Sequence, residues 1–178
     1  MTYYGAQHLA DGFRTVRKNT LTIAEEIPED KYGFKATPEV MSVGDMLAHL
    51  AVSPMWHIEA HGKKIEHVDF AIFSSRMQQA QLEQQALRTK ADIVRALKEN
   101  GEKFAAFVEG LDEATLQGIV SFPPQVGNPK TRFEMLLGAK EHEMHHRGQL
   151  MLLQRLIGQV PHLTRKRQAM QAQAAAGR

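Results

Sequence analysis

The 178-residue chain is long enough for one domain with a single hydrophobic core, since a chain of this size buries roughly 70% of the surface that it exposes when unfolded. Its 22 basic and 20 acidic side chains leave a net charge of +2, which argues against a nucleic-acid partner. The absence of cysteine excludes disulfides, thiolate metal ligands and a thiol nucleophile carried by the chain itself. No stretch approaches the roughly 20 apolar residues of a membrane span, and no apolar leader follows Met1, so we expect a cytoplasmic protein with no membrane partner.

The first third of the chain predicts two helices. Residues spaced alternately by four and three positions form one largely apolar stripe and indicate an amphipathic helix. The residues of this stripe are Leu9, Phe13, Val16, Thr20, Ile23 and Ile27. Pro28 ends this helix. Ser42 with Asp45 forms a capping pair for a second helix that is expected to reach about His61, with a kink at Pro54.

The middle of the chain predicts a loop and two more helical segments. Residues 62–73 are expected to form the loop, and 74–88 a polar helix. Thr89 with Asp92 gives a second capping pair, which opens a helix that ends near Gly110.

The last part of the chain predicts one long connection and one long helix. The connection, 112–130, is rich in proline and glycine and contains a short extended piece at 119–122. Thr131 with Glu134 opens the helix, which can run to Gly158.

These segments predict an all-α fold, a four-helix bundle with long connections, because there are four major helices and no convincing run of strands. We expect the bundle domain to span residues 1–163. Residues 164–178 are then a basic tail rich in Ala and Gln, either a polar helix or a frayed end.

The stretch EHEMHHRGQL, residues 141–150, carries three histidines. At about 100° per residue, His142 and His146 fall on the apolar stripe of the last helix. Two inward imidazoles one turn apart need partners, and one shared metal ion can satisfy both. The pair of His142 with His145 is a second geometric alternative, because His145 lies on the flank of the same stripe.

A catalytic metal site usually takes a third protein ligand. The candidates are His8, His49, His57, His61, His67 and His162. His49 is favoured because it lies at the edge of an apolar arc on the second helix. His57 and His61 follow Pro54 near a helix end, where a solvated histidine is the ordinary outcome, and the remaining candidates lie in predicted loops or beside the first apolar stripe.

His142, Glu143 and His146 also spell H-E-x-x-H, the zinc-peptidase signature in which the glutamate activates water. The chain has no Asp or Glu after Glu143 to act as a third ligand, and Gln149 and Leu152 occupy the glycine and histidine positions of the extended form. Glu143 could reach a bound water or be an ordinary surface carboxylate, and the surface alternative is favoured. A peptidase is therefore the less favoured enzyme.

Two stretches, YGFKATPEVMSVGDMLAHLA at 32–51 and EHEMHHRGQLMLLQRL at 141–156, resemble the DinB-like family, which includes the YfiT-like proteins. The resemblance implies a four-helix bundle that binds a divalent metal ion, often nickel or zinc, through His49, His142 and His146. It leaves His145 as an additional histidine beside the ligands.

The resemblance also implies a metal-dependent enzyme that acts on a small-molecule substrate, a thiol S-transferase or a thiol-dependent isomerase with a low-molecular-weight thiol as cosubstrate. Gln149 and Glu143 are candidates for contacts around the ligands or with substrate, whereas Trp56 is expected to pack in the core. The alternative outside enzymes is a non-catalytic metal-binding protein or a stress-response interaction protein.

A second apolar strip follows the opposite face of the last helix, at Phe133, Leu137, Met144 and Met151. This strip predicts that the helix is covered on both sides, either by the polar helix at 74–88 or by another subunit. A homodimer is the preferred interpretation, in line with the resemblance.

Overall fold

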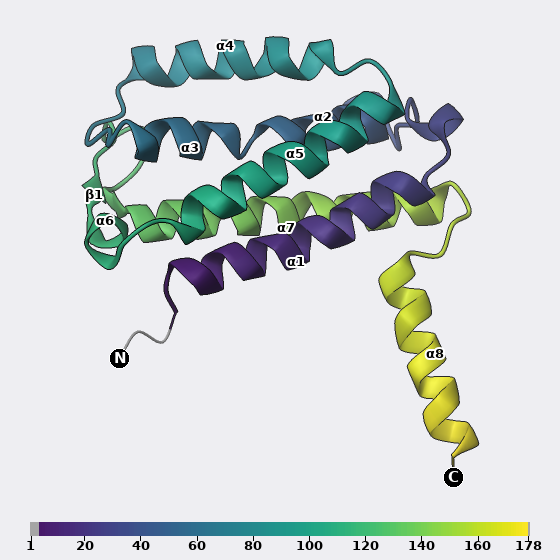
Figure 1. Ribbon diagram of the computed structural model, residues 1–178. Coiled ribbons are helices and arrows are strands. Elements are labelled where there is room, and N and C mark those ends of the chain that lie inside the picture. Colours follow the sequence, from purple (N-terminus) through teal and green to yellow (C-terminus); the bar gives the residue numbers. More distant parts are fainter. Residues whose placement is uncertain (1–3, 178) are drawn as a thin grey trace.

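The computed structural model describes residues 4–177 and confirms the all-α class. Figure 1 shows the bundle helices running side by side, with one further helix outside them and one projecting from the end. The bundle helices are α1 (Ala6–Glu26), α2 (Val43–Val52), α3 (Met55–Gly62), α5 (Lys90–Glu109) and α7 (Arg132–Leu156). The outer helix α4 (Phe70–Ala86) packs on α2, and the last helix is α8 (His162–Ala176). A single 3-10 turn, Glu29–Lys31, follows α1.

The three capping pairs form as the sequence predicts. In each, the hydroxyl oxygen of the N-cap accepts the backbone N–H of the acidic residue three positions later, and the pairs are Ser42 with Asp45, Thr89 with Asp92 and Thr131 with Glu134. Such caps satisfy backbone donors that no helical carbonyl reaches, so the starts of α2, α5 and α7 are fixed locally.

Pro54 divides the predicted second helix into two helices instead of kinking one. Proline has no N–H, so the carbonyl of Leu50 loses its partner in the helix. In the structure this carbonyl accepts a bond from Nη2 of Arg17, at 2.9 Å, and the next carbonyl, that of Ala51, accepts one from Nδ2 of Asn100, at 3.1 Å. Side chains from α1 and α5 therefore stabilise the break.

The loop predicted at 62–73 is shorter than expected, because α4 begins at Phe70. Asp69 explains the earlier start, since its Oδ1 accepts the backbone N–H of Ile72 at 2.8 Å. The long connection 112–130 contains a short helix that was not predicted, α6 (Glu113–Gln117). Its extended piece forms β1 (Ile119–Val120), which pairs antiparallel with β2 (Lys130–Thr131).

The second apolar strip of α7 is partly covered within the subunit. Phe133 and Leu137 pack against a core cluster to which α1 and α5 contribute, while Met144 is 43% exposed. Of the two predicted covers, the polar helix is wrong, because α4 packs along α2, on the far side of the bundle from α7 in Figure 1.

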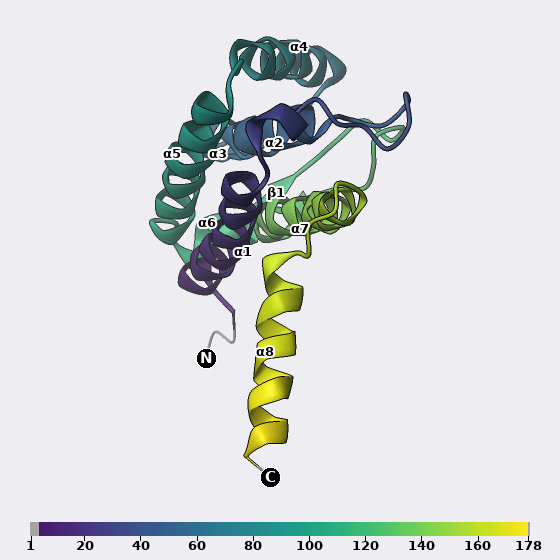
Figure 2. The same cartoon turned by 90° about the vertical axis from the view of Figure 1, so that its right-hand side faces the viewer.

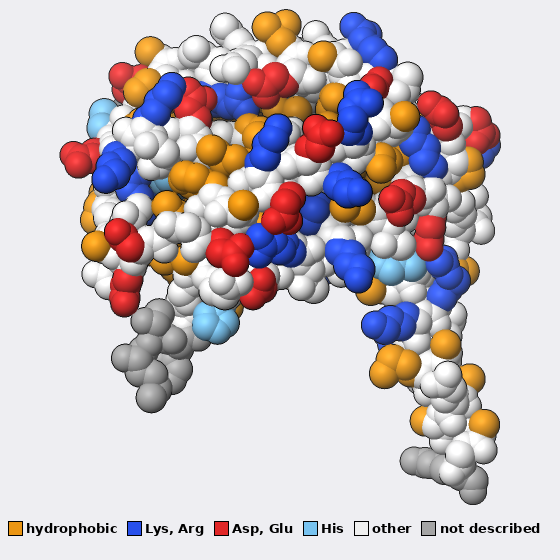
Figure 3. Space-filling model, viewed as in Figure 1, with side chains coloured by type: hydrophobic (Ala, Val, Ile, Leu, Met, Phe, Trp, Pro, Cys, Tyr) orange, Lys and Arg blue, Asp and Glu red, His pale blue; other side chains and the backbone are white. Residues whose placement is uncertain are grey.

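The helix α8 extends away from the bundle, as both views of the chain show (Figures 1 and 2), and none of its residues is buried. Figure 3 shows blue basic side chains near its start and no red ones along it, whereas red and blue alternate over α1 and α5. The alternation includes Arg14, which pairs with Glu102 at 2.8 Å and Glu109 at 2.7 Å. Within residues 4–177, no helix is long and apolar enough to cross a membrane.

Candidate metal centre

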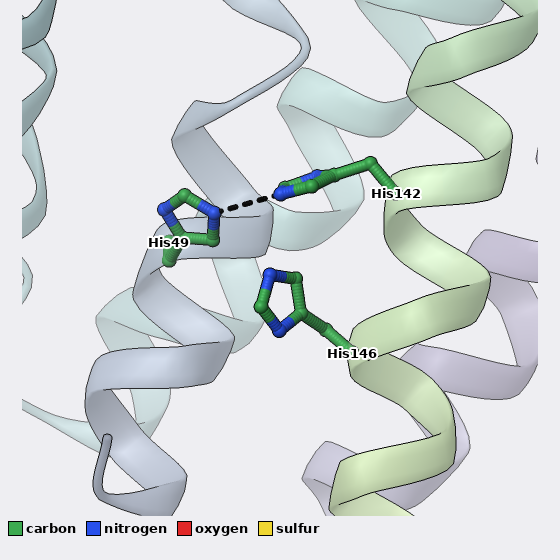
Figure 4. A group of neighbouring side chains, drawn as sticks. All are labelled: His49, His142 and His146. Atoms are coloured by element: carbon green, nitrogen blue, oxygen red, sulfur yellow. Dashed lines mark hydrogen bonds between the residues drawn. The ribbon is translucent and has the colours of Figure 1, made fainter. Parts of the chain in front are cut away.

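Three histidine side chains from two helices converge on one point between α2 and α7. His49 comes from α2, and His142 and His146 come from successive turns of α7 (Figure 4). One ring nitrogen from each residue lies within 4.8 Å of those of the other two. The Nε2 atoms of His49 and His142 are 2.9 Å apart. The structure thus brings together the three residues that the resemblance implied as ligands.

The buried face of α7 is centred elsewhere than the sequence analysis placed it. Its buried residues are Arg132, Met135, Leu136, Ala139, Glu143, Leu150, Leu153 and Gln154. At about 100° per residue, the mean direction of these residues lies about 25° from Glu143 and about 55° from the midpoint between His142 and His146. The two histidines are therefore half-buried at the edge of the core. This position leaves the site accessible to a small molecule.

Two of the three imidazoles, those of His49 and His142, have lowered pKa values that favour the neutral form. Burial is the main cause that lowers the pKa of His49, and the nearby His146 adds to it. Burial, followed by the neighbouring histidines, lowers the pKa of His142 to about 4. Neutral imidazole is the form that binds a metal ion, because the ring nitrogen must offer a lone pair.

Two glutamines contact the rings from outside the group. Oε1 of Gln149 lies 2.7 Å from Nδ1 of His146, and its Nε2 lies 3.3 Å from Nε2 of His145. Since a carbonyl oxygen only accepts, Nδ1 of His146 carries the proton and Nε2 presents its lone pair. Nε2 of Gln84, from α4, lies 3.4 Å from Nδ1 of His49. Such outer contacts orient metal-binding histidines.

These donors fit a divalent ion. Two nitrogens at about 2.0–2.1 Å from one tetrahedral zinc ion lie roughly 3.4 Å apart, so the separations of 2.9 Å and up to 4.8 Å need only small side-chain rotations. In the absence of a cation, the close approach of Nε2 in His49 and His142 needs a proton between them. A set of three imidazoles leaves further positions on an ion for substrate.

Glu143 is buried, so its predicted surface position is wrong. It is 1% exposed, and both of its carboxylate oxygens accept bonds from Arg17, with contacts of 2.7–3.0 Å. Nη1 of Arg17 also donates to the carbonyl of Leu97 at 2.9 Å. A carboxylate engaged in this way is not available to activate water at the histidines, which removes the support for the H-E-x-x-H peptidase.

The other candidate histidines lie outside this group. His61 is 2% exposed, so its predicted solvation is wrong, and its Nδ1 lies 3.0 Å from Nη1 of Arg132. His57 stacks on His61 with the ring centres 5.8 Å apart. Burial lowers the pKa of His57 to about 3 and that of His61 to about 4. Trp56 packs with a small apolar cluster at one end of the bundle, as expected.

His67, His162 and His8 contact local partners instead. Nδ1 of His67 lies 2.9 Å from Oγ of Ser121, and Nε2 of His162 lies 3.1 Å from Oδ1 of Asn19. Nδ1 of His8 accepts the backbone N–H of Gly5. Among residues 4–177, only His49, His142 and His146 form a group of three side chains able to share a metal ion.

Two residues that shape the site were missed by sequence reasoning. Arg17 follows Phe13 by four residues, which places it beside the apolar stripe of α1, and its guanidinium lies 5.1 Å from the centre of the Phe13 ring. That spacing could have marked it as a buried arginine. Gln84 carries no such signal, because it lies in a polar helix in which several glutamines are equivalent in sequence.

Comparisons with known proteins agree with the fold. Residues 13–150 match the model of the DinB superfamily. The chain is 26% identical over 153 residues to the uncharacterized protein YjoA of Bacillus subtilis, covering 86% of this chain and 91% of that protein. The crystal structure of YjoA, a DinB-like protein, superimposes with a TM-score of 0.65 at 24% identity, over 85% of this chain and 92% of that one.

Two further solved structures share the fold. A DinB-like protein from Bacillus cereus gives a TM-score of 0.69 at 15% identity, with 90% of this chain and 97% of that chain covered. YfiT from Bacillus subtilis gives 0.70 at 14% identity, with 89% and 91% covered, and is described as "a probable metal-dependent hydrolase with an unusual four-helix bundle topology".

Proposed function

Because this chain belongs to the DinB superfamily, we propose that it binds a divalent metal ion through His49, His142 and His146 and uses it in catalysis on a small-molecule substrate. The observation that carries the proposal is the convergence of ring nitrogens from three histidines at the half-buried edge of the core. Imidazole donors suit zinc or nickel, and these are the ions we propose.

The proposed reaction is transfer of a low-molecular-weight thiol, or an isomerisation that uses one. A divalent ion at this site would lower the pKa of a bound thiol and make it a better nucleophile. The chain contributes the ring nitrogens, and Gln149 and Gln84 orient two of the rings.

The position of Glu143 favours a thiol over water as nucleophile. Water has a far higher pKa than a thiol, and hydrolytic metal sites commonly use a carboxylate to take its proton. Here that carboxylate is bound to Arg17. The description of YfiT makes a hydrolase the second candidate, since that protein has the same fold. YfiT is only 14% identical to this chain, so its description gives no reason to prefer hydrolysis over thiol transfer.

The first experiment measures metal. Protein purified without an affinity tag is analysed by elemental mass spectrometry, together with the variants His49→Ala, His142→Ala and His146→Ala. We expect close to one ion per chain in the parent and loss of it in each variant. His8→Ala is the matched control, because His8 is exposed and lies outside the group. If the parent protein takes up no metal after zinc or nickel is added, the proposal is contradicted.

The second experiment measures turnover. The metal-loaded protein is assayed with glutathione, bacillithiol and mycothiol against a panel of electrophiles, and with ester and amide substrates for hydrolysis. Thiol-dependent product that disappears in His142→Ala supports transfer, and thiol-independent cleavage supports the hydrolase. Full occupancy with large thermal stabilisation and no turnover identifies a non-catalytic metal site. Cleavage of casein that Glu143→Gln abolishes would restore the peptidase.

We also propose that the protein forms a homodimer and that it is cytoplasmic. The support for the dimer is the group of exposed apolar side chains on α7, Met144 at 43%, Leu152 at 56% and Leu156 at 53%. The cytoplasm is the compartment in which low-molecular-weight thiols are kept reduced. Light scattering of the purified protein measures the oligomeric state, and Leu152→Glu should shift a dimer toward monomer.

A further inference from the structure

A cleft of about 700 Å³ lies along the start of α2, and it shares Gln84 with the surroundings of the metal centre. The segment between α1 and α2 forms one wall, and the first turns of α2 and α5 and the last turns of α4 form the others. Its lining includes Ala48, the residue before His49, and Gln84, which contacts the His49 ring. This volume lies within the range of small-molecule pockets.

The acidic groups of the cleft are already bonded to the chain. Oδ2 of Asp45 accepts the hydroxyl of Ser42 at 2.6 Å, and Oε1 of Glu29 accepts the backbone N–H of Lys90 at 3.2 Å. Bonds from its own backbone and from a neighbouring threonine hold the pKa of the Glu39 carboxyl below its usual value. The acceptors of the cleft are thus largely engaged inside the fold.

The donors of the cleft are divided between engaged and free groups. Nζ of Lys90 donates to two carbonyls at the end of α1, at 2.7 Å each. Lys35 and Arg88 line the same cleft, and within residues 4–177 no hydrogen bond or ion pair occupies either cation. The same holds for the side-chain amides of Gln81 and Gln85. The unused bonding capacity is therefore mainly cationic and suits an anion, and a guanidinium binds a carboxylate through two parallel bonds.

Gln84 connects this cleft to the metal centre. Its Nε2 faces Nδ1 of His49 at 3.4 Å, which suits an imidazole that carries its proton on Nε2. A metal ion held by Nε2 of His49 would leave the ring proton on Nδ1, and Gln84 would supply the acceptor if its amide turned through about 180°. The NH2 group then points away from His49 and can donate to an anion in the cleft.

We infer that the cleft is the binding site for a small carboxylate-bearing molecule, and that metal at His49 and carboxylate in the cleft strengthen each other's binding through the amide orientation of Gln84. The binding half of this inference is independent of the metal, and the coupling half rests on the proposed function. Reciprocal strengthening is required by thermodynamic linkage once one ligand favours the amide orientation that the other needs.

Binding to the cleft is tested on metal-free protein with succinate as the probe, by calorimetric or NMR titration. The neutral isostere succinamide and inorganic phosphate serve as comparison ligands. We expect succinate to bind at least ten-fold more tightly than either, and the Kd to rise at least ten-fold in Arg88→Ala and Lys35→Ala. Arg167→Ala, on the projecting α8, is the matched control and should leave the Kd unchanged. Equal binding of succinamide or phosphate, or of succinate to Arg88→Ala, would overturn the assignment.

Coupling is tested by repeating the succinate titration after loading with zinc. The Kd should fall several-fold in the parent and stay constant in Gln84→Leu. If zinc lowers the Kd for succinate in Gln84→Leu or in Arg88→Ala as well, succinate binds the ion itself, and the coupling is overturned. If the parent takes up no zinc, the proposed function fails, while the titration on metal-free protein still decides whether the cleft binds a carboxylate.

Discussion

Glu143→Gln is the substitution that separates a structural role of this residue from a catalytic one. The glutamate and Arg17 are almost fully buried, at 1% and 4% exposure. Arg17 joins Glu143 of α7 to the carbonyls of Leu97 in α5 and Leu50 in α2, while it belongs to α1 itself. The pair therefore connects four helices of the bundle, α1, α2, α5 and α7. The amide preserves the size of the side chain, removes the charge and replaces one of the two oxygens that accept from Arg17 with an NH2 donor.

The expected loss of stability is large. Removing one partner of a buried ion pair leaves the other charge uncompensated and costs about 3–5 kcal/mol. For a domain of this size, 1 kcal/mol changes the Tm by about 2–4 °C, so we expect a fall in Tm of about 6–20 °C. Replacing both residues, as in Arg17→Met with Glu143→Leu, should recover most of that loss, because neither charge then remains buried.

The assay is urea denaturation of the metal-free proteins, so that metal affinity does not contribute to the free energy of unfolding. Glu141→Gln is the matched control, since Glu141 is exposed on the same helix, and it should change the free energy by less than about 0.5 kcal/mol. Metal content of folded Glu143→Gln should equal that of the parent. A destabilisation below about 1 kcal/mol, or loss of the metal alone, would refute the reasoning.

Three further outcomes are expected. Gln149→Leu removes the acceptor for Nδ1 of His146 and should weaken metal binding about 10–100-fold, measured by competition with a chelating dye, with little change in the Tm of the metal-free protein. The free energy of unfolding should fall as the pH drops from 6.5 toward 4, because His61 takes up a proton in the unfolded chain but stays neutral in the folded one, where its pKa is lowered to about 4. At pH 5 this contribution is about 2 kcal/mol, and chemical denaturation of His61→Gln should show a correspondingly shallower pH dependence. Ser42→Ala removes the cap of α2 and should cost about 1 kcal/mol in the same assay, with an unchanged value contradicting the local account of where α2 begins.

The local features of the fold could be predicted from the sequence. Ser42, Thr89 and Thr131 each precede an acidic residue by three positions, and each begins a helix in the structure. A cap depends on a few neighbouring residues, so its signal is complete within a short stretch of chain. The same holds for the i, i+4 spacing of His142 and His146, which places both rings on one side of α7.

Contacts between distant helices could not be predicted in the same way. Periodicity predicted two apolar strips on opposite faces of α7. The packing of α1 and α2 against this helix decided that Glu143 lies on its buried face. Because the sequence analysis placed the two histidines at the centre of the buried face, it assigned Glu143 to the surface. The buried arginine that reverses this reading lies 126 positions earlier in the chain.

The sequence by itself determined the helical class, the starts of α2, α5 and α7 and the pair of histidines on α7, because each depends on residues within one or two turns. Only the tertiary structure placed His49 within hydrogen-bond distance of His142, 93 positions away, and brought Gln84 against His49 between the metal centre and the cleft. Such placements depend on how whole helices pack, and packing is decided by the summed burial of many side chains, which no single stretch of sequence contains.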